Sequence, residues 1–308
     1  MRKTCLEMVH QLGEIDDRII FIGSDLGPGV LEGMKKEIPN RFLMEGVSEQ
    51  HIIGMAAGLA IEGFIPYINT IATFLTRRCY EQIAIDLCLQ NLPVRLIGSG
   101  GGAVYAPLGP THLAVEDLSI MRVLPNMTII APCDSEEMKR LMIASVNWPS
   151  PIYSRLAKGG DEVVCSNESV FEIGKAILMI EPGDGLFITT GVMTQVALKA
   201  IENLTREGIG CGLMHMHTVK PLDALALSHW IPRVNGIVTV EEHTRIGGLG
   251  SAILEYCNDN IPEQGFKITR VGIPDKFSEK YGNQDTLLKH WELTADHLCE
   301  KMKKTLRV

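Results

Sequence analysis

Short apolar runs that end in a glycine or a polar turn recur along the chain, and this repeat limits the folds open to it. Each run has the length of a buried strand, and residues with helical spacing follow several of them. The runs are residues 18–23, 42–44, 65–69, 94–98, 127–132 and 152–155, then 186–191, 212–217 and 237–243. This alternation predicts an α/β protein in which mostly parallel sheets are wrapped by helices.

The repeat is interrupted once, between residues 161 and 182. Polar and chain-breaking pairs mark both ends of this interval, Asp161–Glu162 and Glu181–Pro182. A chain of 308 residues is also long enough for two domains. We therefore expect two α/β domains, residues 1–160 and 183–308, joined by a linker over residues 161–182.

Charge and cysteine usage restrict the partners and the compartment. The formal net charge is -8, and a nucleic-acid partner is not expected because it would require a basic face. The eight cysteines include no Cys-x-x-Cys pair and lie mostly in apolar runs, which predicts a reduced, cytoplasmic protein without a disulfide framework. No secretory signal and no apolar run of membrane-spanning length is visible, so we expect no membrane partner.

Glu49 stands in a segment that is otherwise rich in small and apolar residues. The segment runs from Glu45 to Ala60, and its glycines and alanines would let a helix pack closely against another surface. A carboxylate that faces such a surface suits proton exchange with a ligand. A carboxylate in the first turn of a helix also complements the helix dipole, and the sequence leaves both interpretations open.

Asp25 and His112 occupy two further positions that favour ligand binding. Asp25 follows the first strand, at the edge where open α/β sheets bind ligands, although an Asp that closes an ordinary turn is the alternative. His112 ends the rigid segment Pro107–His112, and we expect Thr111 to cap a helix that begins near Leu113. There His112 could donate to a ligand oxyanion or move a proton, or simply bond to local backbone.

Two other patterns carry weaker signals. The glycines that follow residues 94–98 could cradle an anion, but such runs are common in loops. His215 and His217 share one face of a strand and could bind a metal ion. No suitably spaced third ligand stands nearby, so a structural or interface role is favoured.

The order and spacing of several motifs resemble the transketolase family of thiamine diphosphate enzymes. The matching segments are Gly46–His51 (Gly-Val-x-Glu-His block), Thr73–Leu75 (aromatic clamp), Gly109–His112 (Gly-Pro-Thr-His), Val240–His243, and the Gly-Gly-x-Gly-Ser helix start near residue 247. The resemblance covers nearly the whole chain. It corresponds to the C-terminal two thirds of a full-length transketolase, which comprise a pyrimidine-binding domain and a C-terminal domain.

The resemblance implies a cofactor site and two catalytic residues. Glu49 would bond the pyrimidine ring of thiamine diphosphate and drive the proton transfer that activates the cofactor. Phe74 would stack on the same ring. Asp25 would lie near the thiazolium side, Arg77 would be a further cofactor contact, and His112, the second catalytic residue, would hydrogen-bond the substrate.

The resemblance also implies a substrate site, with two departures. Arg155, at the end of a strand, matches the family's phosphate-binding arginine, and a guanidinium fork suits a phosphate dianion. Arg77 or Arg78 could assist Arg155 in this role. The family places a sugar-binding Asp four residues before the motif histidine and a sugar-binding His twelve residues before it. Here those positions hold Leu108 and Gly100, so the sequence leaves the donor and acceptor sugars open.

One part of the family's cofactor site is missing from the sequence. The family holds the diphosphate and Mg²⁺ with a Gly-Asp-Gly…Asn-Asn motif. This chain has Gly183–Gly185 but no Asn-Asn pair, and we interpret the triplet as an ordinary turn. The resemblance therefore implies a separate N-terminal subunit that holds most of the thiamine diphosphate and Mg²⁺, with no metal ligand from this chain, in an α2β2 heterotetramer. The small residues 54–58 would then lie at a subunit seam.

The resulting hypothesis is the C-terminal subunit of a split transketolase-like transferase, active only with its N-terminal partner. It would move a two-carbon ketol unit between sugar phosphates or related sugars. The alternatives are a 1-deoxyxylulose-5-phosphate synthase-like activity, a 2-oxo-acid dehydrogenase β-subunit-like activity, and a non-catalytic partner subunit.

Overall fold

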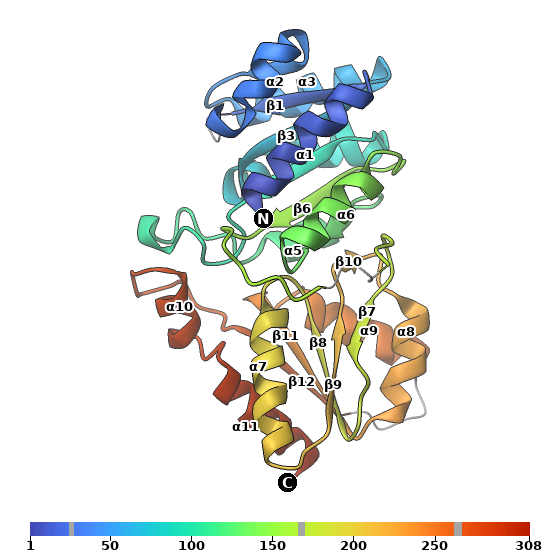
Figure 1. The fold of residues 1–308 in the computed structure, drawn as a ribbon, viewed down its shortest axis with the longest axis vertical. Coiled ribbons are helices and arrows are strands. Elements are labelled where there is room, and N and C mark those ends of the chain that lie inside the picture. The colour runs from blue at the N-terminus through green and yellow to red at the C-terminus, as the bar shows by residue number, and fades with distance from the viewer. Residues whose placement is uncertain (25–27, 166–169, 262–266) are drawn as a thin grey trace.

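Two β-sheets, placed one above the other along the long axis of the molecule, organise the fold (Figure 1). The computed structural model describes residues 1–24, 28–165, 170–261 and 267–308. Both sheets are mostly parallel and are flanked by helices, so the predicted α/β class is confirmed.

The first sheet has seven strands in the spatial order β10-β5-β6-β4-β3-β1-β2. Six of them come from the first half of the chain and pair in parallel with one another. They are β1 (Ile19–Gly23), β2 (Phe42–Met44), β3 (Ile65–Ile71), β4 (Arg95–Ser99), β5 (Thr128–Ile130) and β6 (Ile152–Leu156). Every residue of β3 is buried, because side chains pack against both faces of the sheet.

Helices cover the two faces of this sheet. Helices α1 (Arg2–Ile15) and α6 (Ser135–Ser145) pack on one face, and α3 (Glu49–Ile61) packs on the other. Helix α6 begins at Asp134, whose carboxylate accepts hydrogen bonds from two backbone N–H groups of the first turn. The shorter elements are α2 (Glu32–Glu37), α5 (Asp117–Arg122), η1 (Pro28–Leu31), η2 (Pro39–Arg41) and η5 (Ala106–Leu108).

Residues 75–90, whose apolar side chains have helical spacing in the sequence, form a helix that winds more widely than an α-helix. Segments η3 (Phe74–Arg78) and η4 (Ile83–Leu89) are π-helical, and the short α4 (Tyr80–Gln82) lies between them. Such turns are rare and are frequently found at functional sites. Segment η3 contains two residues of the predicted site, Phe74 and Arg77.

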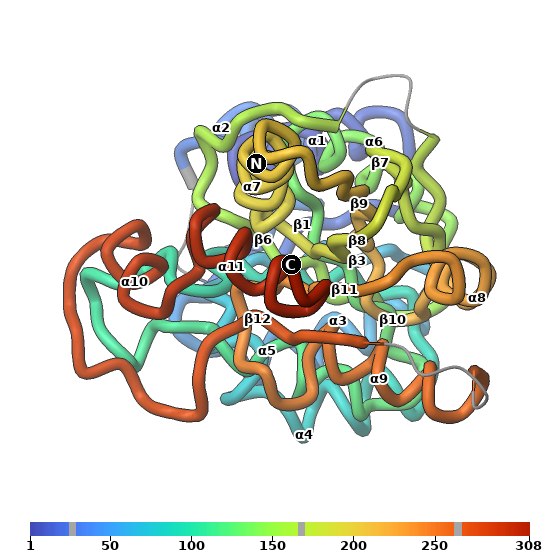
Figure 2. The backbone as a smooth tube through the Cα atoms, turned by 90° about the horizontal axis from the view of Figure 1, so that it is seen from below, coloured from blue at the N-terminus to red at the C-terminus, as the bar shows by residue number. Residues whose placement is uncertain are grey.

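The second sheet has the spatial order β12-β11-β8-β9-β7. Its strands are β7 (Ile177–Ile180), β8 (Gly185–Thr189), β9 (Cys211–His215), β11 (Gly236–Thr244) and β12 (Ile268–Ile273). Its helices are α7 (Met193–Arg206), α8 (Ala224–Trp230), α9 (Leu249–Asn260), α10 (Gln284–His290) and α11 (Ala295–Leu306), with the turn η6 (Ile231–Arg233). Helices α7 and α11 cover one face and α8 and α9 the other, and Figure 2 shows α7 and α9 on opposite sides of the strands.

The domain boundary in the structure differs from the boundary expected from the sequence in two respects. Strand β7 lies inside the interval 161–182 and pairs antiparallel with β9. Its apolar run ends at Glu181–Pro182, so these breaking residues mark the end of a strand, and the linker stops before Ile177. Strand β10 (Thr218–Lys220) follows β9 but joins the edge of the first sheet, antiparallel to β5. The second half of the chain therefore contributes one strand, β10, to the sheet of the first domain.

The cysteine side chains lie in the apolar interior. All eight are buried, and no disulfide bond joins them in the described part of the chain. Buried thiols pack as small apolar groups. Within the same described ranges, no helix combines the length and the apolarity that crossing a membrane requires.

Candidate active site

Glu49 is the first residue of α3, and its side chain turns into the protein. Only 2% of the residue is exposed. Its Oε2 accepts a hydrogen bond from Arg78 Nη1 at 2.7 Å, and Ser24 Oγ lies 3.4 Å from its Oε1. The carboxylate therefore sits at the positive end of the helix dipole and also faces side chains of two neighbouring elements.

Phe74 connects Glu49 to His112 through a chain of contacts. The guanidinium carbon of Arg78 lies 4.3 Å from the centroid of the Phe74 ring, and the same guanidinium bonds Glu49. The rings of Phe74 and His112 meet edge to face, with centroids 5.1 Å apart. Three predicted site residues, Glu49, Phe74 and His112, are thus brought together, although they lie far apart in the sequence.

The loop that carries His112 is held by two side chains. Thr111 Oγ1 and His112 Nδ1 share a hydrogen bond of 2.8 Å. Arg77 Nη2 donates to the backbone carbonyls of Thr111 at 3.2 Å and Leu113 at 3.4 Å, and Arg77 Nε lies 3.0 Å from a carboxylate oxygen of Glu116. Arg77 therefore links η3 to the backbone on both sides of the histidine.

The prediction that Thr111 caps a helix near Leu113 is wrong. Helix α5 begins later, at Asp117. Ala114 instead exchanges two backbone hydrogen bonds with Gly102, of 2.9 and 3.1 Å, which ties this part of the chain to the glycine run. The Thr111 hydroxyl is consequently used to orient the imidazole of His112.

Two other predicted cofactor contacts stand apart from this cluster. The described contacts of Arg77 are directed toward the His112 loop and not toward Glu49, so its contact with a cofactor stays a prediction. Asp25 lies outside the described residues. The arginine that does contact Glu49 is Arg78, four residues after Phe74. That spacing, about one helical turn, is the signal that could have identified it.

Arg155 lies at the junction between the two domains, with 7% of its surface exposed. Its Nε donates to Asp117 at 2.8 Å, and its Nη2 donates to the carbonyls of Ala114 and Glu242, each at 2.8 Å. Tyr153 also donates to Asp117, at 2.6 Å. Burial by itself lowers the pKa of Arg155, but the Asp117 and Glu242 carboxylates together outweigh burial and raise that pKa. The guanidinium is thus a fixed cation within the chain.

The glycine run after β4 does cradle an anion, and that anion is a carboxylate of the same chain. Ala103 N donates to Glu242 Oε1 at 2.9 Å, and Gln284 Nε2 donates to the same oxygen at 2.9 Å. Gly102 has a φ of +68°, and a Cβ at this position would collide with the Glu242 carboxylate. A Cβ at Gly101 would collide with the Arg155 side chain. The glycines are needed so that this backbone can approach both charged groups.

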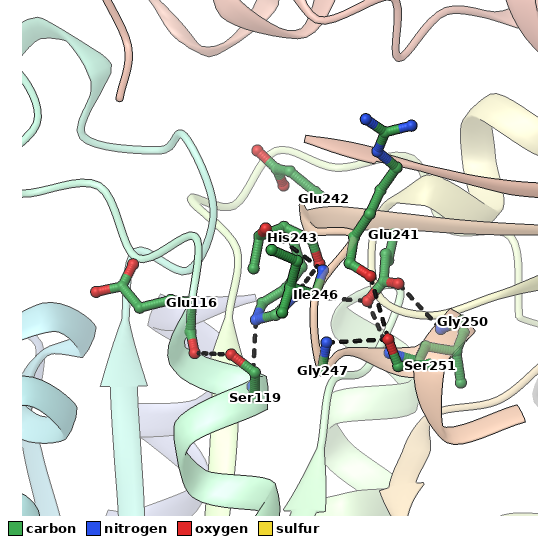
Figure 3. Close-up of polar contacts among 12 residues, drawn as sticks. Glu116, Ser119, Glu241, Glu242, His243, Ile246, Gly247, Gly250 and Ser251 are labelled. Carbon is green, nitrogen blue, oxygen red and sulfur yellow. Dashed lines mark hydrogen bonds and ion pairs between the residues drawn. The ribbon is translucent and has the colours of Figure 1, made fainter. Parts of the chain in front are cut away.

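The end of β11 joins three elements at this junction (Figure 3). Glu241 accepts hydrogen bonds from the first N–H groups of α9, Leu249 N at 2.7 Å and Gly250 N at 2.9 Å. Burial raises the pKa of Glu241 to about 7, and these two hydrogen bonds oppose the rise. His243 Nε2 accepts from Ser119 N at 3.2 Å, so β11 also positions α5. Burial lowers the pKa of His243 to about 4, which keeps the imidazole neutral.

His215 provides another buried contact between the domains. Its Nε2 lies 2.9 Å from Glu137 of α6, and its Nδ1 lies 2.8 Å from Thr194 of α7. Burial by itself raises the pKa of Glu137, but His215, together with His217 and the backbone N–H of Cys133, outweighs burial and lowers that pKa to about 2. His217 stacks on Phe171, with ring centroids 4.2 Å apart. Both histidines therefore make structural contacts at the junction.

A cavity of 560 Å³ opens beside the His112 loop. Both domains line it, through Arg77, Glu116, Lys276, Phe277 and Trp291 among others. Its volume is in the range of small-molecule sites. It extends the cluster around His112 toward the C-terminal domain.

Comparison with known proteins places this geometry in a family. The family model described as "Transketolase, pyrimidine binding domain" matches residues 1–160, and "Transketolase, C-terminal domain" matches residues 174–298. Together they define the class, a protein built from the pyrimidine-binding and C-terminal domains of transketolases.

Individual relatives agree with this assignment. The 6-deoxy-6-sulfo-D-fructose transketolase subunit of Clostridium sp. (strain MSTE9) is 34% identical over 97% of this chain and 92% of its own length. The 1-deoxy-D-xylulose-5-phosphate synthase of Halothermothrix orenii is 37% identical over 87% of this chain, which matches 42% of that longer protein. A solved structure described as a split gene transketolase, inactive beta4 tetramer, has a TM-score of 0.91 and 32% identity, and the match covers 99% of this chain and 98% of that one. The chain belongs to the transketolase family, which is thiamine diphosphate-dependent.

Proposed function

We propose that this chain is the C-terminal subunit of a split transketolase-like enzyme that transfers a two-carbon ketol unit between sugar phosphates or related sugars. The observation that carries the proposal is the buried carboxylate of Glu49, which is joined through Arg78 to Phe74 and His112. The name of the Clostridium relative, a transketolase subunit, supports it.

The surroundings of Glu49 fit the aminopyrimidine end of thiamine diphosphate. The planar guanidinium of Arg78 lies over Phe74 and donates to Glu49, which are the contacts that a flat, nitrogen-bearing ring would make there. Glu49 and Phe74 would hold this ring, and Glu49 would exchange a proton with its nitrogen. When bound, the cofactor supplies the carbon nucleophile that the amino-acid side chains lack.

His112 is suited to donate a hydrogen bond to the substrate. If the Thr111 hydroxyl donates to Nδ1, then Nε2 carries the proton and is the atom that would meet a substrate oxygen. Arg77 keeps the backbone around this histidine in place. A phosphate bound by Arg155 would meet Nη1, because Nε and Nη2 already bond Asp117 and two carbonyls.

An N-terminal subunit would complete the site. The Gly183–Gly185 triplet leads into β8, and Asp184 N donates to Gly210 O at 2.8 Å, so the backbone of this triplet is engaged by the segment before β9. The outer side of α3 exposes Gly54 and Gly58, and exposed apolar side chains surround it, including Val47, Ile61 and Leu89. This surface is where the partner, which holds the diphosphate and Mg²⁺, would dock in an α2β2 assembly.

Product analysis of the assembled enzyme tests the proposal. The chain and its N-terminal subunit are incubated with thiamine diphosphate, Mg²⁺, a ketose phosphate donor and an aldose phosphate acceptor. We expect a new ketose lengthened by two carbons. The second candidate, a 1-deoxyxylulose-5-phosphate synthase-like reaction, is favoured by the Halothermothrix relative. Consumption of pyruvate without any ketose transfer would support it and contradict our proposal.

A further inference from the structure

We infer that Arg78 occupies the place of the cofactor's pyrimidine ring in the uncomplexed subunit and is displaced when the cofactor binds. This inference rests on the proposed function. It concerns a different residue from those that would hold the cofactor, and it assigns to Arg78 the role of a competitor.

The geometry shows that Arg78 uses both partners of the ring. Its Nη1 donates to Glu49 Oε2 at 2.7 Å, and its guanidinium carbon lies 4.3 Å from the centroid of Phe74. A guanidinium is flat, carries N–H donors and stacks on aromatic faces, so it resembles an aminopyrimidine in shape and in hydrogen bonding. One carboxylate and one ring face cannot hold both groups in the same place.

Exposure makes Arg78 the movable member of the pair. The Arg78 side chain is 43% exposed, whereas that of Glu49 is 2% exposed. Its backbone is held in place, since Gln50 Nε2 donates to Arg78 O at 3.1 Å. Cys79 Sγ also donates to Phe74 O at 3.4 Å, within the same turn. The side chain can therefore swing into solvent while η3 and the Phe74 ring stay where they are.

The neighbouring arginine provides a built-in contrast. Arg77 lies in the same π-helical turn and has a similar exposure, 40%. Its contacts are the carbonyls of Thr111 and Leu113 and the carboxylate of Glu116. Removal of Arg77 would therefore loosen the His112 loop without uncovering Glu49 or Phe74.

The contact between Arg78 and Glu49 stabilises the subunit before it is assembled with its partner. A carboxylate as deeply buried as that of Glu49 is costly without a partner. Arg78 supplies that partner, together with a weaker contact from Ser24, as long as no cofactor is present. Because Arg78 is 43% exposed, its ion pair with Glu49 and its cation–π contact with Phe74 are weak enough to exchange. We expect this competition to reduce the apparent cofactor affinity by about five- to thirtyfold.

Calorimetric titration of the assembled complex with thiamine diphosphate in the presence of Mg²⁺ tests the inference. Complexes are prepared with the wild-type chain, Arg78→Ala, Arg78→Lys and, as the matched control, Arg77→Ala. We expect Arg78→Ala to bind the cofactor about five- to thirtyfold more tightly than wild type, and Arg78→Lys to fall between them because lysine lacks the planar fork. Arg77→Ala should bind no more tightly than wild type.

The possible results separate this inference from the proposed function. Unchanged or weaker binding in Arg78→Ala, with a thermal melt like that of wild type, would overturn the competitor role of Arg78 while leaving the proposed function intact. If Arg78→Ala fails to fold, Arg78→Lys decides the question in the same way. A wild-type complex that binds no thiamine diphosphate would contradict the proposed function itself, and this inference with it.

Discussion

Two arginine–carboxylate pairs in this chain have nearly the same length but different surroundings. Arg78 lies 2.7 Å from Glu49 in the candidate active site, and Arg155 lies 2.8 Å from Asp117 at the domain junction. The Arg78 side chain is 43% exposed, whereas that of Arg155 is 7% exposed and bonds two carbonyls besides. Distance alone therefore does not separate a pair that can open from one that is fixed in place at the domain junction. Exposure and additional hydrogen bonds do.

The largest expected effect is on catalysis, at the exposed pair. Glu49→Gln removes the proton-exchanging carboxylate and should lower kcat of the assembled enzyme by about 10²- to 10⁴-fold. The chain should remain folded, because glutamine has nearly the same shape and can still accept a hydrogen bond from Arg78. Turnover assays with the complex measure this. Glu45→Gln, the same change at an exposed position four residues earlier, is the control and should leave turnover unchanged.

A non-catalytic role for the subunit is tested by the same variant. Turnover of the Glu49→Gln complex at the wild-type rate would support a partner subunit without chemistry of its own. It would also mean that the Glu49–Arg78 pair has no catalytic role.

Breaking the buried pair of Arg155 and Asp117 should lower the stability of the chain. Arg155→Met leaves Asp117 without its cation in a buried site and should reduce the free energy of unfolding by about 3–5 kcal/mol. Urea denaturation of the isolated chain measures the change. Arg18→Met, which breaks the exposed pair with Asp16, is the control and should cost less than about 1 kcal/mol. A similar small loss for both variants would mean that burial does not distinguish the two kinds of pair.

Glu241 makes the domain junction sensitive to pH. Because burial raises its pKa from 4.5 to about 7, its contribution to stability is full below pH 4.5 and is lost as pH rises through 7. The free energy of unfolding should therefore fall over this window by at most about 3 kcal/mol.

Glu241→Gln isolates this contribution. The variant should be less stable overall, because Leu249 N and Gly250 N bond different oxygens of Glu241 and an amide replaces one of these acceptors by an NH2 donor. Its pH dependence between 4.5 and 7 should be flatter than that of wild type. Denaturation series at several pH values measure the difference. Parallel curves for the two proteins would show that Glu241 does not titrate in this window.

The smallest of these effects concerns Arg77 and sharpens the contrast with Arg78. Arg77→Ala frees the backbone on both sides of His112 and should lower kcat by about 10- to 100-fold, with little change in KM. Steady-state kinetics of the complex separate the two parameters. A raised KM with normal kcat would instead assign Arg77 to ligand binding.

Much of the fold could be predicted because local sequence determines it. Each apolar run assigned to the first domain is a strand. The partners of a strand depend on contacts far along the chain, so neither the pairing of β7 with β9 nor that of β10 with β5 could be inferred from Ile177–Ile180 or Thr218–Lys220.

In the candidate site, too, local motifs could be predicted from the sequence, whereas contacts between distant segments could not. Glu49, Phe74 and His112 were predicted from motifs, and they meet in the structure. The capping role of Thr111 failed because Ala114 pairs with Gly102, a contact that local helix signals do not encode. The carboxylate in the glycine run, that of Glu242, comes from the other domain and could only be found in three dimensions.

The central claim is that this chain supplies Glu49 and Phe74 to a cofactor anchored mainly by another subunit. Titration of thiamine diphosphate with Mg²⁺ into the chain alone and into the assembled complex tests it most directly. We expect saturable, tight binding by the complex and far weaker binding by the isolated chain. Equally tight binding by the isolated chain would contradict the split site.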